Sequence, residues 1–92
     1  MENDRKRRDR LYIIAEILNI AKDGSLKTQI MYRANLSFAQ LNEYLGFLTK
    51  MDLLAIQKED KKNSYQTTAK GEKYLEKYKD IANILGDSDE DI

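Results

Sequence analysis

The segment from Asn35 to Leu41 constrains the fold of this chain more than any other, because it predicts a tight turn between two helices. Asn35 readily adopts the left-handed backbone conformation that such a turn requires. Ser37 is a good N-terminal helix cap, and Gln40 three residues later completes a capping box. Leu36 before the cap and Leu41 four residues after it form a hydrophobic staple. The turn therefore ends at Ser37, and a new helix begins directly after it.

Apolar spacing predicts the elements on either side of this turn. A first helix is expected from about Arg5 to Lys22, where two apolar rows recur at helical spacing, and Gly24 is a typical left-handed cap after it. The remaining elements are a short extended piece at 25–26, helices at about 28–34 and 38–51, strands near 54–58 and 65–67 around a polar turn at 59–64, and a helix from a cap at Thr68 to about Leu85. We predict an α+β fold, mainly helical, with one domain at residues 1–86 and an acidic tail at 87–92.

Composition limits the chemistry open to this chain. Its 92 residues contain no cysteine and no histidine, which excludes disulfides, the usual zinc ligands and histidine-dependent nucleophiles. We therefore expect no enzyme activity, no metal, no cofactor and no small-molecule substrate. No apolar run approaches the ~18 residues that a membrane-spanning helix needs, and no signal-peptide pattern opens the chain. We expect a cytoplasmic protein.

Charge is distributed unevenly along the chain although the formal net charge is zero. Residues 1–79 contain all 16 lysines and arginines but only 11 of the 16 acidic residues, whereas residues 80–92 contain the other five. The body is therefore basic and the C-terminal end acidic. A basic body attracts polyanions, and an acidic end moderates that attraction.

The predicted order of elements, a helix-turn-helix followed at once by a two-stranded hairpin, is the winged-helix arrangement. The segments "TQIMYRANLSFAQLNEYLGFLTKMDLL" and "YQTTAKGEKYLEKY" resemble the small archaeal winged helix-turn-helix DNA-binding proteins and predicted transcriptional regulators. The resemblance runs from about Ile14 to Tyr78. It implies a nucleoid-associated homodimer, often paired through the C-terminal helix, that binds double-stranded DNA. It also implies that helix 38–51 enters the major groove and that the wing at 59–64 touches the DNA backbone.

The outward row of helix 38–51 supplies the candidate base contacts. The carboxamides of Gln40 and Asn42 match adenine N6 and N7, and Glu43 can accept from cytosine N4. The competing interpretation assigns the Gln40 amide to the capping box and leaves Asn42 in solvent. The candidate base contacts are Ser37, Ala39, Gln40, Asn42 and Glu43.

Candidate contacts to the DNA backbone lie outside this row, on the second helix, at the end of the third and on the wing. They are Lys27, Gln29, Arg33, Lys50, Lys58, Lys61, Lys62 and Asn63. The segment "DRKRRDR" adds a possible DNA-binding arm with Arg5, Lys6, Arg7 and Arg8. The alternative is that these cations are ordinary solvated surface, or that the arm contacts the acidic tail.

Two apolar stripes are candidates for dimerisation. Tyr74, Tyr78, Ile81 and Leu85 repeat at spacings of four, three and four, which makes two heptads of a coiled-coil seam. The first helix has an unusually wide apolar arc, so the flank with Ile13 and Ile17 is a second candidate. The alternative places each stripe in the core of one protomer.

Two other functions are compatible with this sequence. One is an architectural protein that coats DNA with little sequence preference, which the polar outward row of helix 38–51 favours. The other is a winged-helix adapter that binds protein, because this helix is nearly neutral and is bordered by Phe38, Tyr44 and Phe47.

Overall fold

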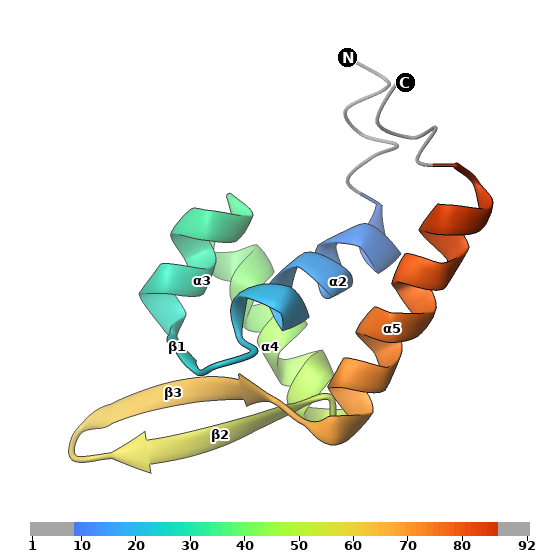
Figure 1. The fold of residues 1–92 in the computed structure, drawn as a ribbon. Helices are drawn as coiled ribbons and strands as arrows, with labels where there is room; N and C mark the ends of the chain where they lie inside the picture. Colours follow the sequence, from blue (N-terminus) through green and yellow to red (C-terminus); the bar gives the residue numbers. More distant parts are fainter. Residues whose placement is uncertain (1–8, 87–92) are drawn as a thin grey trace.

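The computed structural model describes residues 9–86, and its elements follow the predicted order (Figure 1). They are α2 at Arg10–Ile20, β1 at Ser25–Leu26, α3 at Lys27–Ala34, α4 at Phe38–Lys50, β2 at Leu54–Glu59, β3 at Lys62–Thr67 and α5 at Ala69–Ile84. A helix-turn-helix, α3 and α4, is followed directly by a β-hairpin, so the predicted winged-helix fold is confirmed. The predicted acidic tail at 87–92 lies outside the described residues.

The three strands form one antiparallel sheet in the order β1-β3-β2. Glu59 pairs with Lys62, so only Asp60 and Lys61 connect the two wing strands. The predicted six-residue turn at 59–64 is therefore wrong in its bounds. Asp60 has a φ of 59°, and this left-handed conformation helps two residues to reverse the chain. The outer half of the hairpin is polar on both faces, so no alternating pattern marked it as strand.

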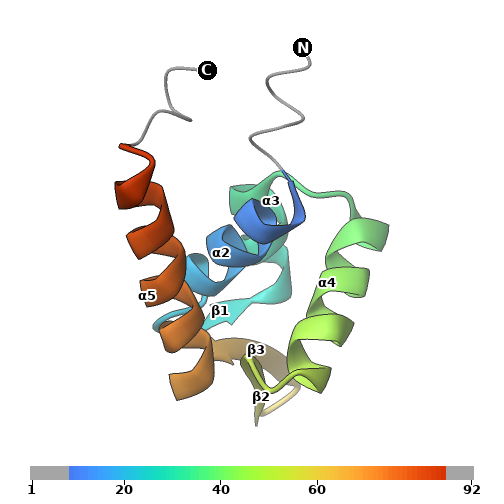
Figure 2. The same ribbon diagram turned by 90° about the vertical axis from the view of Figure 1, so that its right-hand side faces the viewer.

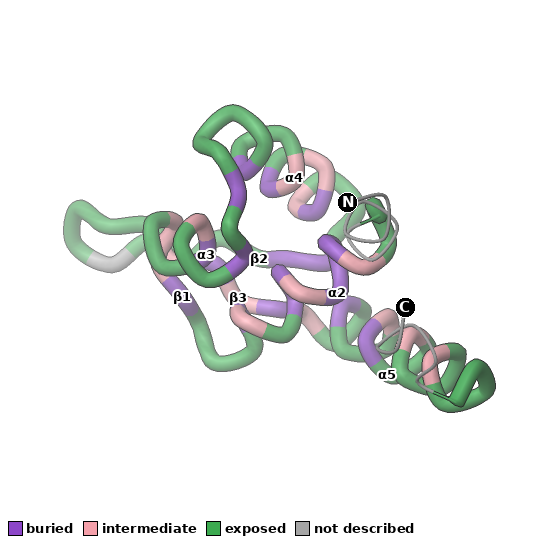
Figure 3. Tube along the Cα trace, turned by 90° about the horizontal axis from the view of Figure 1, so that it is seen from above, coloured by how far each residue is buried: buried purple, intermediate pink, exposed green. Residues whose placement is uncertain are grey.

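The helix α2 lies at the centre of the molecule, between α5 on one side and α4 on the other (Figure 2). Buried positions follow one another along it (Figure 3). Ile17 is fully buried and Ile13 is 8% exposed. The flank of this helix with Ile13 and Ile17 is thus buried within one protomer, which removes these two residues from the candidate dimer surface and corrects that prediction.

The helix α2 also begins later than predicted, at Arg10 rather than near Arg5. Asp9 is extended, with φ −71° and ψ 175°, and its side chain accepts a hydrogen bond of 2.9 Å from the backbone N–H of Tyr12. This is an N-cap, a position that aspartate favours. The surrounding run of arginines and lysines concealed the cap in the sequence.

Polar side chains attach the sheet to the C-terminal end of α2. The hydroxyl of Thr67 donates to the Leu18 carbonyl at 2.6 Å, and the backbone N–H of Thr67 donates to the Ala21 carbonyl at 3.0 Å. The hydroxyl of Ser25 donates to the Ile20 carbonyl at 3.0 Å. These bonds satisfy carbonyl groups that a helix end leaves without intrahelical partners, so β1 and β3 are held against α2.

Tyr74 attaches α5 to the start of α2. Its hydroxyl donates to the Leu11 carbonyl at 2.9 Å. Burial raises the pKa of Tyr74 to about 12, and the nearby Tyr78 and Asp9 add to this rise because a phenolate would be repelled by them. The hydroxyl therefore stays protonated, and able to donate, at any pH near neutrality.

Replacing Gly71 by alanine should destabilise the fold, whereas the same change at Gly46 should not. A Cβ at Gly71 would clash with the Leu53 carbonyl oxygen and lie 2.6 Å from Thr67 Cγ2, whereas a Cβ at Gly46 meets nothing within 4 Å. We expect Gly71→Ala to lower the free energy of unfolding by about 1–3 kcal/mol through overpacking. Gly46→Ala should raise it by up to about 1 kcal/mol through helix propensity. Urea denaturation followed by circular dichroism measures both, and equal midpoints would contradict the packing at Gly71.

Candidate nucleic-acid interface

The turn between α3 and α4 has the predicted geometry. Asn35 ends α3 in the left-handed conformation, with φ 57° and ψ 52°. The backbone N–H of Leu36 donates to the Met31 carbonyl at 3.1 Å. Leu36 and Leu41 are both buried, as the hydrophobic staple requires. These contacts fix the direction in which α4 leaves the turn.

The predicted capping box at the start of α4 is confirmed. The backbone N–H of Gln40 donates to Ser37 Oγ at 3.1 Å, and the backbone N–H of Ser37 donates to Gln40 Oε1 at 3.0 Å. The Gln40 amide oxygen is thus turned back onto its own helix. Its Nε2 amino group has no hydrogen-bond partner within residues 9–86, and the residue is exposed.

The outward face of α4 is exposed and nearly neutral. All five predicted base contacts are exposed, namely Ser37, Ala39, Gln40, Asn42 and Glu43. The amide of Asn42 makes no hydrogen bond within the described part of the chain, so both of its polar groups are available. Phe38, which the predicted row did not include, is 61% exposed at the first position of the helix.

The side chains predicted to contact the DNA backbone lie on α3, at the end of α4 and on the wing. Arg33, Lys50, Lys58, Lys61, Lys62 and Asn63 are exposed. Lys27 is half-buried, and its Nζ lies 4.8 Å from the centre of the Phe38 ring. Gln29 is exposed, but its Oε1 accepts from the backbone N–H of Leu26 at 2.9 Å, so it caps α3. The predicted arm, Arg5 to Arg8, lies outside the described residues.

The wing and α3 lie at the opposite end of the molecule from α5 (Figures 1 and 3). The far end of α5 exposes a second surface, which is apolar. Ile81 and Leu85 are more than half exposed, whereas Tyr74 and Tyr78 are half-buried, with parallel rings whose centres are 6.4 Å apart. Ile84, which the coiled-coil pattern omitted, is 82% exposed. Its spacing of three from Ile81 is the signal that would have found it.

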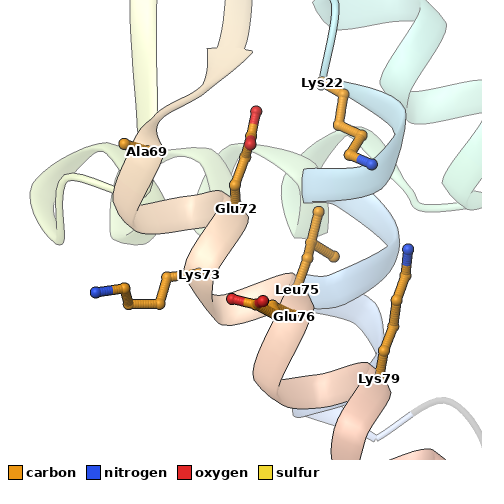
Figure 4. A pocket seen from close by; sticks show the side chains of 7 residues that line it. All are labelled: Lys22, Ala69, Glu72, Lys73, Leu75, Glu76 and Lys79. Atoms are coloured by element: carbon orange, nitrogen blue, oxygen red, sulfur yellow. The ribbon is translucent and has the colours of Figure 1, made fainter.

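Two hollows border α5. One, of about 550 Å³, lies between α2, α4 and α5 and has an apolar floor that includes Leu11, Phe47 and Met51. The other, of about 430 Å³, is lined mainly by charged side chains that include Lys22, Glu72, Glu76 and Lys79 (Figure 4). Because lysines and glutamates both line the second hollow, it does not favour a ligand of either charge. Within residues 9–86, no three carboxylates come together as metal ligands would.

No helix in residues 9–86 is long and apolar enough to cross a membrane. Comparison with known proteins matches residues 7–86 to the family model described as winged helix-turn-helix. The chain is 32% identical over 84 residues to the uncharacterized protein MJ0287 of Methanocaldococcus jannaschii, covering 90% of this chain and 82% of that protein. It is 40% identical over 80 residues to the uncharacterized protein MJ0290 of the same organism, covering 86% of this chain but only 36% of that longer protein.

Two solved structures share the fold. One is Sso10a-2, a DNA-binding protein from Sulfolobus solfataricus, with a TM-score of 0.74, 25% identity and coverage of 91% of this chain and 92% of that one. The other is BpsR of Bordetella bronchiseptica, whose DNA binding is regulated by 6-hydroxynicotinic acid. Its TM-score is also 0.74, but at 15% identity, covering 91% of this chain and 62% of that one, it supports the fold alone.

Variants of Gln40 should show how much its capping hydrogen bond contributes to stability. Gln40→Ala removes the bond to the Ser37 N–H and should lower the free energy of unfolding by about 0.5–1 kcal/mol. Gln40→Glu keeps an oxygen for that bond and adds a negative charge near the helix N-terminus, so its stability should equal or exceed the wild-type value. Urea denaturation measures both variants. A Gln40→Ala protein as stable as wild type would contradict an energetic contribution from this cap.

Proposed function

Because the chain belongs to the winged helix-turn-helix family, we propose that it binds double-stranded DNA as a dimeric transcriptional regulator. The observation that carries the proposal is the exposed, nearly neutral face of α4, together with the exposed cations on α3 and on the wing of the same fold. The likeness to Sso10a-2 over most of both chains supports the same function. Affinity and selectivity then come from different parts of one surface.

In this proposal α4 enters the major groove, which is wide enough to admit a helix. Recognition helices contact base edges mainly through their N-terminal residues. Asn42 offers a donor and an acceptor together, the pattern that adenine N6 and N7 require, and Glu43 can accept from cytosine N4. The contacting set is Ser37, Ala39, Gln40, Asn42 and Glu43.

The DNA backbone is held by the surrounding cations and polar side chains. Each phosphate that a lysine or arginine neutralises releases counterions, which gives affinity that falls steeply with salt. The proposed set is Lys27, Gln29, Arg33, Lys50, Lys58, Lys61, Lys62 and Asn63, with Arg5, Lys6, Arg7 and Arg8 as a further arm. Because α4 itself carries little charge, the wing and α3 supply most of the electrostatic attraction.

The dimer forms in this proposal through the exposed end of α5. Ile81, Ile84 and Leu85 form an apolar surface that the protomer leaves uncovered. Tyr74 and Tyr78 continue it toward the body. A twofold pair of protomers would then contact two half-sites about one helical turn apart, ~34 Å.

One observation also favours a second candidate, a protein that coats DNA with little sequence preference. The capping box occupies polar groups of Ser37 and Gln40, which reduces the number of side chains left to distinguish bases. Selection of bound sequences from a random duplex pool at physiological salt separates the two. A regulator enriches one motif, whereas a coating protein enriches none.

Reversing the charge of the wing tip should weaken DNA binding. We expect Lys61→Glu with Lys62→Glu to lower affinity at least tenfold and to reduce the slope of log affinity against log salt by about 2. The matched control is Lys22→Glu with Lys79→Glu, which changes the same charge beside the hollow of Figure 4. Fluorescence anisotropy over a salt series measures both. Equal losses in the two double variants would show that net charge, not the wing, matters, and no binding by wild type would refute the function.

A charge placed at the end of α5 should weaken the dimer. Burial of an isoleucine side chain stabilises by about 1.5–3 kcal/mol, so Ile84→Asp should raise the dimer dissociation constant at least tenfold. Asn83→Asp, at an exposed neighbouring position on the same helix, is the matched control and should leave it nearly unchanged. Sedimentation equilibrium measures the constants. A wild-type protein that remains monomeric at high concentration would refute the dimer.

A further inference from the structure

The first turn of α4 presents apolar groups where a recognition helix would present polar ones. Phe38 is 61% exposed and Ala39 is exposed beside it. A single exposed apolar side chain is common and by itself means little. Here the position matters, because these two residues open the helix whose N-terminal end meets base edges in the proposed function.

The surroundings of Phe38 hold its ring on this surface. Lys27 Nζ lies 4.8 Å from the ring centre, within the range of a cation–π interaction. Lys27 begins α3, so the contact links the start of α3 to the start of α4. The ring is thereby restrained beside a cation that is itself a proposed phosphate contact.

The polar atoms of the same turn are largely occupied. Ser37 Oγ and Gln40 Oε1 both accept backbone hydrogen bonds in the capping box. The exposed groups that remain are the Phe38 ring, the Ala39 methyl group, the Ser37 hydroxyl hydrogen and the Nε2 amino group of Gln40. The turn thus combines apolar surface with hydrogen-bond donors.

Only one base offers the complementary pattern in the major groove. Thymine carries a C5-methyl group, which alanine and phenylalanine contact, next to the acceptor O4. Cytosine lacks the methyl and presents the N4 amino donor, which would face the Gln40 donor unfavourably. We infer that Phe38 and Ala39 select thymine through its C5-methyl group, an inference that rests on the proposed binding of α4 in the major groove.

Deoxyuridine tests this directly, because it differs from thymidine only by that methyl group and keeps O4 and its pairing. A bound duplex is first compared with the same sequence in which every thymine is replaced, and then with single replacements. We expect one or two positions at which wild-type affinity falls about fourfold, the loss that one buried methyl group predicts. A duplex with cytosine at such a position should bind weakly, and a duplex with 5-methylcytosine there should recover part of the affinity.

Protein variants assign the effect to residues. The Phe38→Ala variant should bind two duplexes equally when they differ only by thymine or deoxyuridine at one sensitive position. The control is Tyr32→Ala, which removes an aromatic side chain that is 79% exposed on α3 and should preserve the ratio of the two affinities. Both residues are exposed, so both variants should fold, and circular dichroism checks this.

The outcomes are distinct. Wild-type affinity that is unchanged by deoxyuridine at every position overturns the inference while leaving DNA binding intact. The same penalty in Phe38→Ala as in wild type at every sensitive position shows that Phe38 contacts no thymine methyl group, and this also overturns the inference. Failure of wild type to bind any duplex refutes the proposed function itself, and is seen before any base is replaced.

Discussion

The burial of α2 is the constraint on which the rest of this structure depends. The elements α3, α5 and β3 all pack against it. Carbonyl groups at its C-terminal end accept hydrogen bonds from Ser25 and Thr67, which fixes the sheet relative to the helix. Thr67 is itself buried, so its hydroxyl needs this partner, since an unpaired buried donor costs about 1–3 kcal/mol. Because the helix-turn-helix and the wing are attached to the same helix, the core of one protomer sets their relative position.

The start of α4 illustrates how a structural requirement limits a binding surface. The first N–H groups of a helix have no intrahelical partners, and Ser37 satisfies one of them. Gln40 then satisfies the N–H of Ser37 itself, so its carboxamide is no longer a free donor–acceptor pair. Asn42, two residues further on, makes no such bond within the described residues. Gln40 and Asn42, whose carboxamides look equivalent in the sequence, therefore differ in the hydrogen bonds they can offer to a partner. Phe38 gains importance on this surface because its polar neighbours already make hydrogen bonds within the helix.

Much of the fold follows from local rules, and the errors have physical causes. The left-handed Asn35 and the capping box were predictable because each depends on a few adjacent residues. The wing turn was misplaced because the outer hairpin is solvated on both faces, so its strands lack an apolar period. The sequence did not show whether Ile17 packs within its own protomer or against a second one, because periodicity shows that a face is buried but not by which chain. Phe38 was predicted to border the outward row and not to belong to the base contacts, because its exposure and its contact with Lys27 depend on tertiary packing.

The distribution of charge over the fold favours a division between holding DNA and distinguishing bases. Cations such as Lys61 and Lys62 lie on the wing. Phosphates attract these cations equally in DNA of any sequence. The face of α4 has Glu43 as its only charge before Lys50 at its end, so in the proposed complex a wrong base would meet little compensating attraction there. Selectivity on such a face depends on the fit of small neutral groups, whose individual contributions are modest. It therefore requires a rigid α4, and the capped turn and buried α2 provide that rigidity.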